Sequence, residues 1–223
     1  MTIQKACPTC SSPCHQECRI ISGVHVVVSG SYDCRKQPCF DHVHTDMLVL
    51  GMLRGINAHD FAWAVDARLS QLIHKQLEDH KFTGELGTYL VLDLVKLGEQ
   101  REHLRYIVIV GIGYTSEFSR KAVCSTFGMA LDKARELGVR KIAMPIPPSR
   151  LTADGINLKG TGATLRCRIG QNLKAHGSLG NLNEIEIIVT RQARRHFEQG
   201  LDIEGPLCRF CSLPKLDKIR RKL

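Results

Sequence analysis

Two pairs of cysteines at opposite ends of the chain are the residues whose spacing most clearly indicates chemistry. Cys7 and Cys10 form one Cys-x-x-Cys pair, and Cys208 and Cys211 form the other. This spacing places two thiolates on one tight turn, an arrangement that suits tetrahedral zinc. Because the ends of a compact domain are often close together, the two pairs could form one four-thiolate site. We expect such a site to be structural, because it leaves no open position for a reacting group.

The N-terminal segment also offers a local alternative. Cys14 and Cys18 follow Cys7 and Cys10 closely, so the four together could form the site, and an iron–sulfur cluster is an alternative to zinc. The N-terminus has no signal-peptide core, and no apolar run approaches the roughly 20 residues that a membrane helix needs. We therefore expect a cytoplasmic protein whose cysteines bind metal instead of forming disulfides.

The remaining cysteines give weaker indications. One loop contains two cysteines and two histidines that could form a second metal site: Cys34, Cys39, His42 and His44. A polar loop is the simpler interpretation, and we adopt it. Cys124 and Cys167 lie in predicted helices without a catalytic pattern around them, so we expect buried structural thiols.

Two glycine-rich stretches could hold an anion. Gly111 and Gly113 end a predicted strand. The second stretch is Lys159, Gly160, Thr161 and Gly162. Each stretch precedes a predicted helix, so free N–H groups and helix N-termini would meet at one edge of a sheet and could bind phosphate. The alternative is that the glycines only form tight turns or allow close packing; we favour it for the first stretch and give both interpretations equal weight for the second.

The positive charge of the chain is concentrated near its C-terminus. The net charge is +9, and residues 190–223 contain nine Lys or Arg against four acids, a net of +5. Its last part could bind nucleic acid through Lys215, Lys218, Arg220, Arg221 and Lys222. A solvated tail is the interpretation that charge alone favours.

The elements that must position these groups are organised around residues 106–148. Residues 106–113 are apolar and rich in β-branched side chains, which predicts a buried strand. Residues 118–137 have apolar positions at helical spacing, and Gly138 stands where a helix C-terminal cap is expected. A second strand is predicted from Val139 to Met144. Strand, helix and strand in about forty residues predict a βαβ crossover with parallel strands.

Further elements surround this unit. Strands are predicted at residues 23–28, 45–53, 88–94 and 183–189. Helices are predicted at residues 57–81, with Asn57 or Asp60 as the cap, at 163–175 after a glycine-rich loop over 152–162, and at 191–200 with Thr190 as the cap. Residues 215–223 could form a short basic helix.

The order of these elements resembles the N-terminal domain of the leucine aminopeptidase family, which has a macro-domain-like fold. The resemblance rests on the Phe-x-Gly-x-x-Gly turn at residues 82–87, the Val-Gly-Ile-Gly strand end at 110–113, and the helix and strand that follow. It covers residues 24–201. It implies an α/β fold with a three-layer arrangement, a mixed sheet flanked by helices.

The resemblance is to the non-catalytic half of that family. The family's peptidase activity resides in a separate C-terminal domain with a two-metal site, which this sequence does not contain. Macro domains that bind ADP-ribose carry an Asn-Ala-Ala-Asn stretch and a Gly-Gly-Gly-Val loop, and neither occurs here. The cysteine segments at the two ends are additions that the resemblance does not explain.

We therefore expect a cysteine-rich segment over residues 1–19, a macro-like α/β domain over 20–204, and a Cys-x-x-Cys and basic tail over 205–223. The first functional hypothesis is a non-catalytic binding or regulatory module for a phosphate-bearing ligand, a nucleotide or ADP-ribose derivative, or for a partner protein. The second is nucleic-acid binding through the zinc element and the basic tail. The third is a hydrolase of ADP-ribose derivatives, ranked last because the Asn and Gly signatures are missing.

Overall fold

A seven-stranded sheet forms the centre of the fold. The computed structural model describes residues 19–29, 43–55, 65–146 and 157–203. The strands are β1 (Arg19–Ile21), β2 (Val24–Ser29), β3 (Met47–Leu53), β4 (Tyr89–Asp93), β5 (Tyr106–Gly113), β6 (Lys141–Pro145) and β7 (Glu184–Ile188). Their order across the sheet is β1-β2-β7-β6-β3-β5-β4. Strands β2, β7, β6, β3 and β5 run parallel, whereas β1 and β4, at the two edges, are antiparallel to their neighbours.

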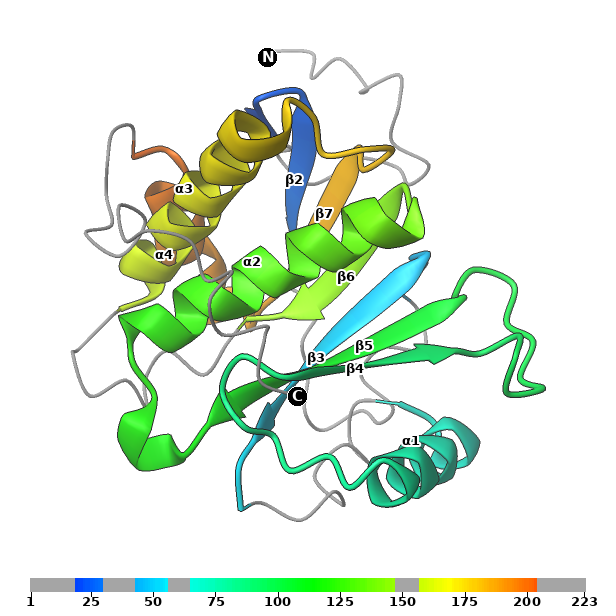
Figure 1. The fold of residues 1–223 in the computed structure, drawn as a ribbon. Helices are drawn as coiled ribbons and strands as arrows, with labels where there is room; N and C mark the ends of the chain where they lie inside the picture. Colours follow the sequence, from blue (N-terminus) through cyan, green and yellow to red (C-terminus); the bar gives the residue numbers. More distant parts are fainter. Residues whose placement is uncertain (1–18, 30–42, 56–64, 147–156, 204–223) are drawn as a thin grey trace.

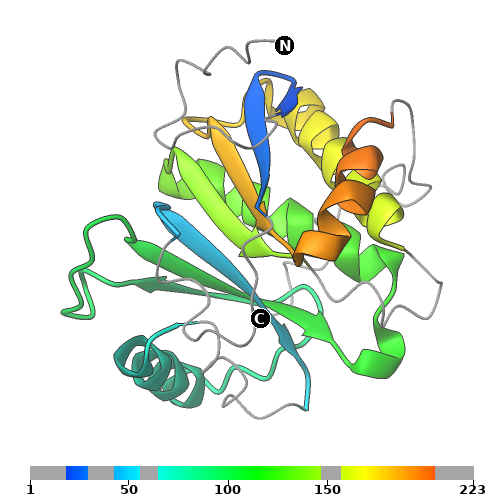
Figure 2. The ribbon, with the colours of Figure 1, turned by 180° about the vertical axis from the view of Figure 1, so that it is seen from behind.

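Within the described residues, four helices cover the two faces of the sheet and make the three layers expected from the sequence. They are α1 (Ala67–Asp79), α2 (Arg120–Leu137), α3 (Leu158–His176) and α4 (Arg191–Leu201), and a short 3-10 helix, η2 (Thr115–Glu117), precedes α2. Figures 1 and 2 show α2, α3 and α4 on one face and α1 on the other. Each face has its own apolar core, because successive side chains of a strand point to opposite faces.

The βαβ unit predicted from the sequence is present. β5 is buried along its whole length, and α2 leads from it to β6. Gly138 ends α2 in a left-handed conformation with a φ of 66°, as its position predicted. The two strands of the crossover are not neighbours, because β3 lies between them and pairs with both. The all-apolar composition of β5 is therefore explained by helices on both faces and strands on both sides.

Helix α1 begins later than the sequence predicted. Its N-cap is Asp66, whose Oδ1 accepts a hydrogen bond from the Leu69 N–H at 3.0 Å. The same carboxylate pairs with Arg101 at 2.6 Å, which ties the start of the helix to the connection between β4 and β5. The candidate caps Asn57 and Asp60 lie outside the described residues. The helix therefore starts after Asp66, and the ion pair with Arg101 holds this cap in place.

Helix α3 begins earlier than predicted, at Leu158 instead of residue 163, so residues 159–162 are helical and not part of a loop. Glycine disfavours helix interiors, which is why the sequence predicted a loop here. Packing explains the exception. A Cβ on Gly162 would lie 2.2 Å from the carbonyl oxygen of Phe197, and one on Gly200 would lie 2.0 Å from that of Lys159. The two glycines therefore allow α3 and α4 to pack with their backbones in close contact.

No helix in the described part of the chain is long and apolar enough to cross a membrane.

We predict opposite effects for alanine at two glycines of α3. Gly162→Ala should destabilise the protein by about 1–3 kcal/mol, because the new methyl group meets the α4 backbone. Gly170 is exposed, and no neighbouring atom lies within 4 Å of the place that a methyl group would take, so Gly170→Ala should stabilise by about 0.5–1 kcal/mol through helix propensity. Urea unfolding of the two variants measures both shifts. Equal shifts would contradict close packing at Gly162.

Candidate functional site

The carboxyl edge of the parallel strands is where the described chain gathers groups able to bind a ligand. β5, β6 and β7 are each followed by a helix of the same face, so α2, α3 and α4 begin near this edge. Helix N-termini carry unpaired N–H groups and a partial positive charge. In open α/β sheets, ligands bind outside the carboxyl ends of the strands. This edge is therefore the candidate site.

The first glycine stretch lies at this edge, but its N–H groups already have partners. The Gly111 N–H donates to the carbonyl of Thr88 at 2.9 Å, and the Gly113 N–H donates to the carbonyl of Gly84 at 3.0 Å. A Cβ on Gly111 would lie only 2.1 Å from the carbonyl oxygen of Glu85. The turn at residues 82–87 thus packs directly on the end of β5. These contacts agree with the packing role that we favoured for the two glycines.

The second stretch forms the first turn of α3, with Asn157 as the N-cap. The side-chain Oδ1 of Asn157 accepts a hydrogen bond from the Gly160 N–H at 2.8 Å. The backbone carbonyl of Asn157 accepts from the Thr161 N–H at 2.9 Å and from the Thr161 hydroxyl at 3.0 Å. Thr161 is fully buried. Gly162 faces α4, as described above. Lys159 is exposed and is the member of this stretch whose charge remains open to a ligand.

Two residues that the sequence analysis did not single out complete the described edge. Arg54 follows β3 and Tyr114 follows β5, and the Arg54 guanidinium lies 4.9 Å from the centre of the Tyr114 ring. The Arg54 N–H also donates to the carbonyl of Gly113 at 2.8 Å, which fixes the two strand ends to each other. Tyr114 is 41% exposed. A cation and an accessible aromatic face are the groups that bind phosphates and stack on planar rings.

A simple signal in the sequence could have pointed to both residues. Each stands immediately after a predicted buried strand, and parallel strands end at the same edge. Searching that position for charged and aromatic side chains would have selected Arg54 and Tyr114.

The other candidate site residues are divided between described and undescribed parts of the chain. Those that lie outside the described residues are Cys7, Cys10, Cys14, Cys18, Cys34, Cys39, His42, Cys208, Cys211, Lys215, Lys218, Arg220, Arg221 and Lys222. Within the described ranges, no group of three or more His, Cys, Asp or Glu side chains is placed to hold a metal ion. His44 packs its ring against His103, with centroids 4.3 Å apart. Cys124 is buried as expected, whereas Cys167 is only half-buried, which corrects that expectation.

Comparison with solved structures shows the fold. The N-terminal region of a tomato leucine aminopeptidase mutant superimposes with a TM-score of 0.53 and 15% identity, covering 80% of this chain and 35% of that protein. An Oceanobacillus iheyensis macrodomain mutant with ADPR gives a TM-score of 0.55 at 14% identity and covers 83% of this chain and 96% of that one. The Trypanosoma brucei macrodomain in complex with ADP gives 0.53 at 14% identity, covering 82% and 70%. The chain therefore has a macro-domain-like α/β fold.

Comparison of sequences shows the family. The search of curated proteins found no match. A family model described as "Cytosol aminopeptidase family, N-terminal domain" matches residues 49–163, just over half of the chain. The match is confined to the N-terminal domain of that family and gives no support to a peptidase activity. The matched range includes most of β3, the turn at residues 82–87, β5, α2 and the start of α3. On this evidence the chain belongs to the cytosol aminopeptidase family, through the N-terminal domain of that family.

Proposed function

We propose that this chain is a non-catalytic module that binds a phosphate-bearing small molecule, a nucleoside diphosphate or an ADP-ribose derivative, at the carboxyl edge of its parallel strands. The observation that carries the proposal is the match to macrodomains solved with ADP and with ADPR, which extends over more than four fifths of this chain. The fold alone does not specify a ligand. The groups at the edge supply the remaining argument.

The charges and aromatic surface at the edge suit such a ligand. Arg54 offers a guanidinium with several N–H donors that match phosphate oxygens, and Lys159 adds a second cation in the first turn of α3. Arg54 covers the Tyr114 ring from one direction and Tyr114 as a residue is 41% exposed, so a planar base could stack against the ring. The N-termini of α3 and α4 favour negative charge at the same edge.

The mode of binding we infer differs from a glycine-loop cradle. Because the N–H groups of Gly111 and Gly113 are bonded to the turn at residues 84–88, they are not available to a phosphate. The phosphates would instead depend on side chains, above all Arg54. Substitution of that side chain should therefore weaken binding more than it would in a site built from backbone N–H groups.

This proposal is tested by isothermal titration with ADP and ADP-ribose, with adenosine as the ligand that lacks phosphate. Arg54→Gln should weaken ADP binding by about tenfold or more, the loss expected for a charge-assisted contact. The matched control is Arg105→Gln. The Arg105 guanidinium also lies 4.9 Å from the centre of a tyrosine ring, that of Tyr106, but at the opposite end of β5. Tyr114→Leu should weaken ADP and adenosine alike, whereas Tyr89→Leu, at another exposed tyrosine, should change neither.

Several results would contradict the proposal. Absence of ADP and ADP-ribose binding would do so, and so would equal losses in the Arg54 and Arg105 variants. Binding of a single-stranded oligonucleotide that falls steeply with salt, without nucleotide binding, would instead support the basic tail from Lys215 to Lys222 as a nucleic-acid site. Chemical change of ADP-ribose derivatives during incubation would support the hydrolase alternative.

We also propose that the two Cys-x-x-Cys pairs bind one structural zinc ion. The described ends of the domain support it, because Arg19 at the start of β1 pairs with Asp202 after α4 at 2.7 Å. The hydrogen bond from Arg19 lowers the pKa of the Asp202 carboxyl, so the pair is charged at neutral pH. Cys10 precedes Arg19 by nine residues, and Cys208 follows Asp202 by six. An extended chain covers roughly 3.3 Å per residue, so these two segments are long enough to bring the two cysteine pairs together.

Elemental analysis of protein purified without oxygen tests the zinc site. We expect one zinc ion per chain, lost in a Cys208→Ser, Cys211→Ser double variant together with several degrees of thermal stability. Cys14→Ser with Cys18→Ser is the matched control and should keep the metal. Metal lost only in the control would support the local N-terminal site, iron with visible absorbance would support a cluster, and no metal in the native protein would refute both.

A further inference from the structure

One side of the sheet ends at β4 in the part of the chain that the structure describes. This strand pairs with β5 and, within the described residues, with nothing on its other side. The Gly111 N–H donates to the carbonyl of Thr88, and the Leu94 N–H donates to the carbonyl of Arg105. These two hydrogen bonds show which residues of β4 direct their backbone groups toward β5 and which direct them away from it. It follows that Leu90 and Leu92 bond toward β5, whereas the backbone N–H groups of Tyr89, Val91 and Asp93 point outward.

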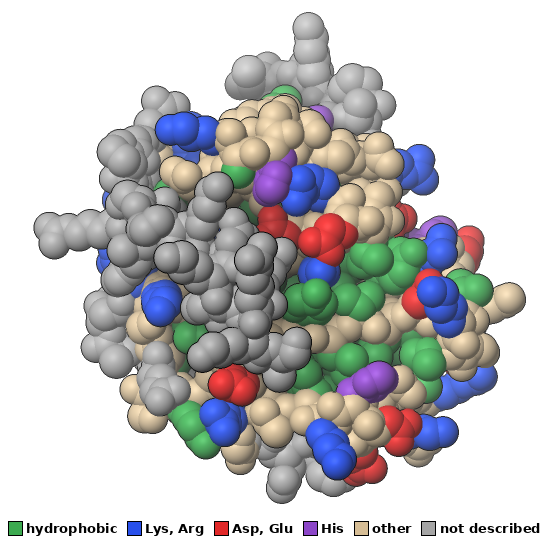
Figure 3. Space-filling view, in the orientation of Figure 1, with side chains coloured by type: hydrophobic (Ala, Val, Ile, Leu, Met, Phe, Trp, Pro, Cys, Tyr) green, Lys and Arg blue, Asp and Glu red, His purple; other side chains and the backbone are tan. Residues whose placement is uncertain are grey.

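Among the described residues, this strand carries little of the protection that proteins usually place at an exposed edge. Edge strands are commonly guarded by charges, proline or bulges that prevent another strand from pairing with them. The sequence of β4 is Tyr-Leu-Val-Leu-Asp, with its only charge at the last position. Tyr89 and the nearby Val95 are 43% and 54% exposed. Figure 3 shows hydrophobic side chains gathered over the strip between α2 and α1, where β4 lies.

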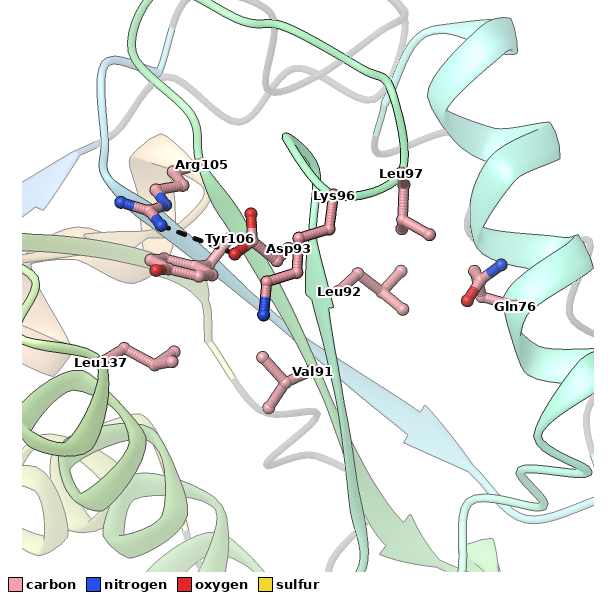
Figure 4. A pocket seen from close by; sticks show the side chains of 9 residues that line it. All are labelled: Gln76, Val91, Leu92, Asp93, Lys96, Leu97, Arg105, Tyr106 and Leu137. Atoms are coloured by element: carbon pink, nitrogen blue, oxygen red, sulfur yellow. Dashed lines mark ion pairs between the residues drawn. The ribbon is translucent and has the colours of Figure 1, made fainter.

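A pocket of about 390 Å³ opens at the C-terminal end of β4. Its walls combine apolar and charged side chains from β4, β5, the connection between these two strands, α1 and α2: Gln76, Val91, Leu92, Asp93, Lys96, Leu97, Arg105, Tyr106 and Leu137. Figure 4 shows Arg105, Asp93 and Lys96 grouped together, with Val91 and Leu137 below them and Gln76 on the side of α1. The pocket as a whole is large enough for one side chain of a ligand.

The charges of the pocket select the ligand's chemistry. Arg105 pairs with Asp93 at 3.6 Å and keeps 59% of its side chain exposed. Lys96 is exposed, and no carboxylate of the described residues pairs with it, which leaves a surplus positive charge beside the apolar wall. The Oδ1 atom of Asp93 is buried and has no hydrogen-bond partner within the same residues. The pocket thus offers cations for a carboxylate and an acceptor for an N–H donor.

We propose that the outer side of β4 and this pocket bind an extended polypeptide segment as an additional strand of the sheet. The outward backbone groups of Tyr89 and Val91 bond to the peptide, an apolar side chain of the peptide fills the pocket, and a carboxylate of the peptide is held by Lys96 and Arg105. Strand addition to an exposed edge, with pockets for alternate side chains, is a general mode of peptide recognition.

The test uses fluorescein-labelled heptapeptides with Val, Leu or Tyr at alternate positions, prepared in three forms. One form has a free C-terminal carboxylate, the second has a C-terminal amide and no acid, and the third has an amide with glutamate as its last residue. Fluorescence anisotropy should show at least one acidic form binding about tenfold tighter than the neutral amide. The two acidic forms distinguish a chain terminus from an acidic side chain.

Two protein variants and their controls locate the binding. Lys96→Glu should weaken the acidic peptide about tenfold, whereas Lys174→Glu, the same exchange at an exposed lysine in the last turn of α3, should not. Arg105→Gln should weaken peptide but not ADP, and Arg54→Gln should weaken ADP but not peptide. This pair of results separates the present proposal from the proposed function, so that either can fail alone.

Strand addition has its own signature. Val91→Pro removes one outward N–H at an edge position where proline is tolerated, and should abolish peptide binding while ADP binding persists. Methylation of single peptide nitrogens should weaken binding at every second position only. The proposal would be overturned if the peptide affinity were the same with and without the carboxylate, if Lys96→Glu left it unchanged, or if methylation had the same effect at every position. Absence of binding by all three peptides would also overturn it. A dimer in light scattering that Val91→Pro dissociates, without peptide binding, would overturn it in favour of a second copy of the chain.

Discussion

The contact between Gly111 and the turn at residues 84–88 is the constraint on which much of the rest depends. The carbonyl oxygen of Glu85 occupies the space where a side chain at position 111 would begin. The chain can therefore leave α1, cross the end of β5 and return as β4, antiparallel to it. The same turn binds the N–H groups of Gly111 and Gly113 and leads directly into β4, which lies at one end of the strand order. One close approach of two backbones thus shapes both the carboxyl edge and the open side of the sheet.

Much of the fold could be predicted because the hydrophobic periodicity and composition of each segment indicate whether it forms a strand or a helix. The run from Tyr106 to Gly113 has apolar residues on both faces, which occurs where a strand is covered on both sides, and the structure confirms it. The start of α3 could not be predicted in the same way. Gly160 and Gly162 indicate a loop by their own propensity, whereas in the structure both are helical and Gly162 packs against the backbone of α4, more than thirty residues later in the chain.

The candidate site was less predictable than the fold for a related reason. A Gly-x-Gly sequence after a strand shows that two N–H groups are present, but it does not show whether another turn of the protein already binds them. In this chain the partners are the carbonyls of Thr88 and Gly84, which belong to a different motif. Arg54 and Tyr114 show the converse. Neither belongs to a recognisable motif, and their proximity follows from the pairing of β3 with β5.

β5 also explains why the two proposed sites can act independently. Arg105 and Tyr106 stand at its beginning, and Gly113 and Tyr114 stand at its end. Between them every residue is buried, and residues 107–110 pair with β3 on one side and β4 on the other, so the strand has little freedom to change register. The arginine–tyrosine pairs at the two ends have equal separations but different neighbours. Arg105 is partly neutralised by Asp93, whereas no carboxylate of the described residues pairs with Arg54. A phosphate, with more charge than a carboxylate, is therefore better matched to the end of β5 that carries Arg54, and a peptide to the end that also offers an open strand.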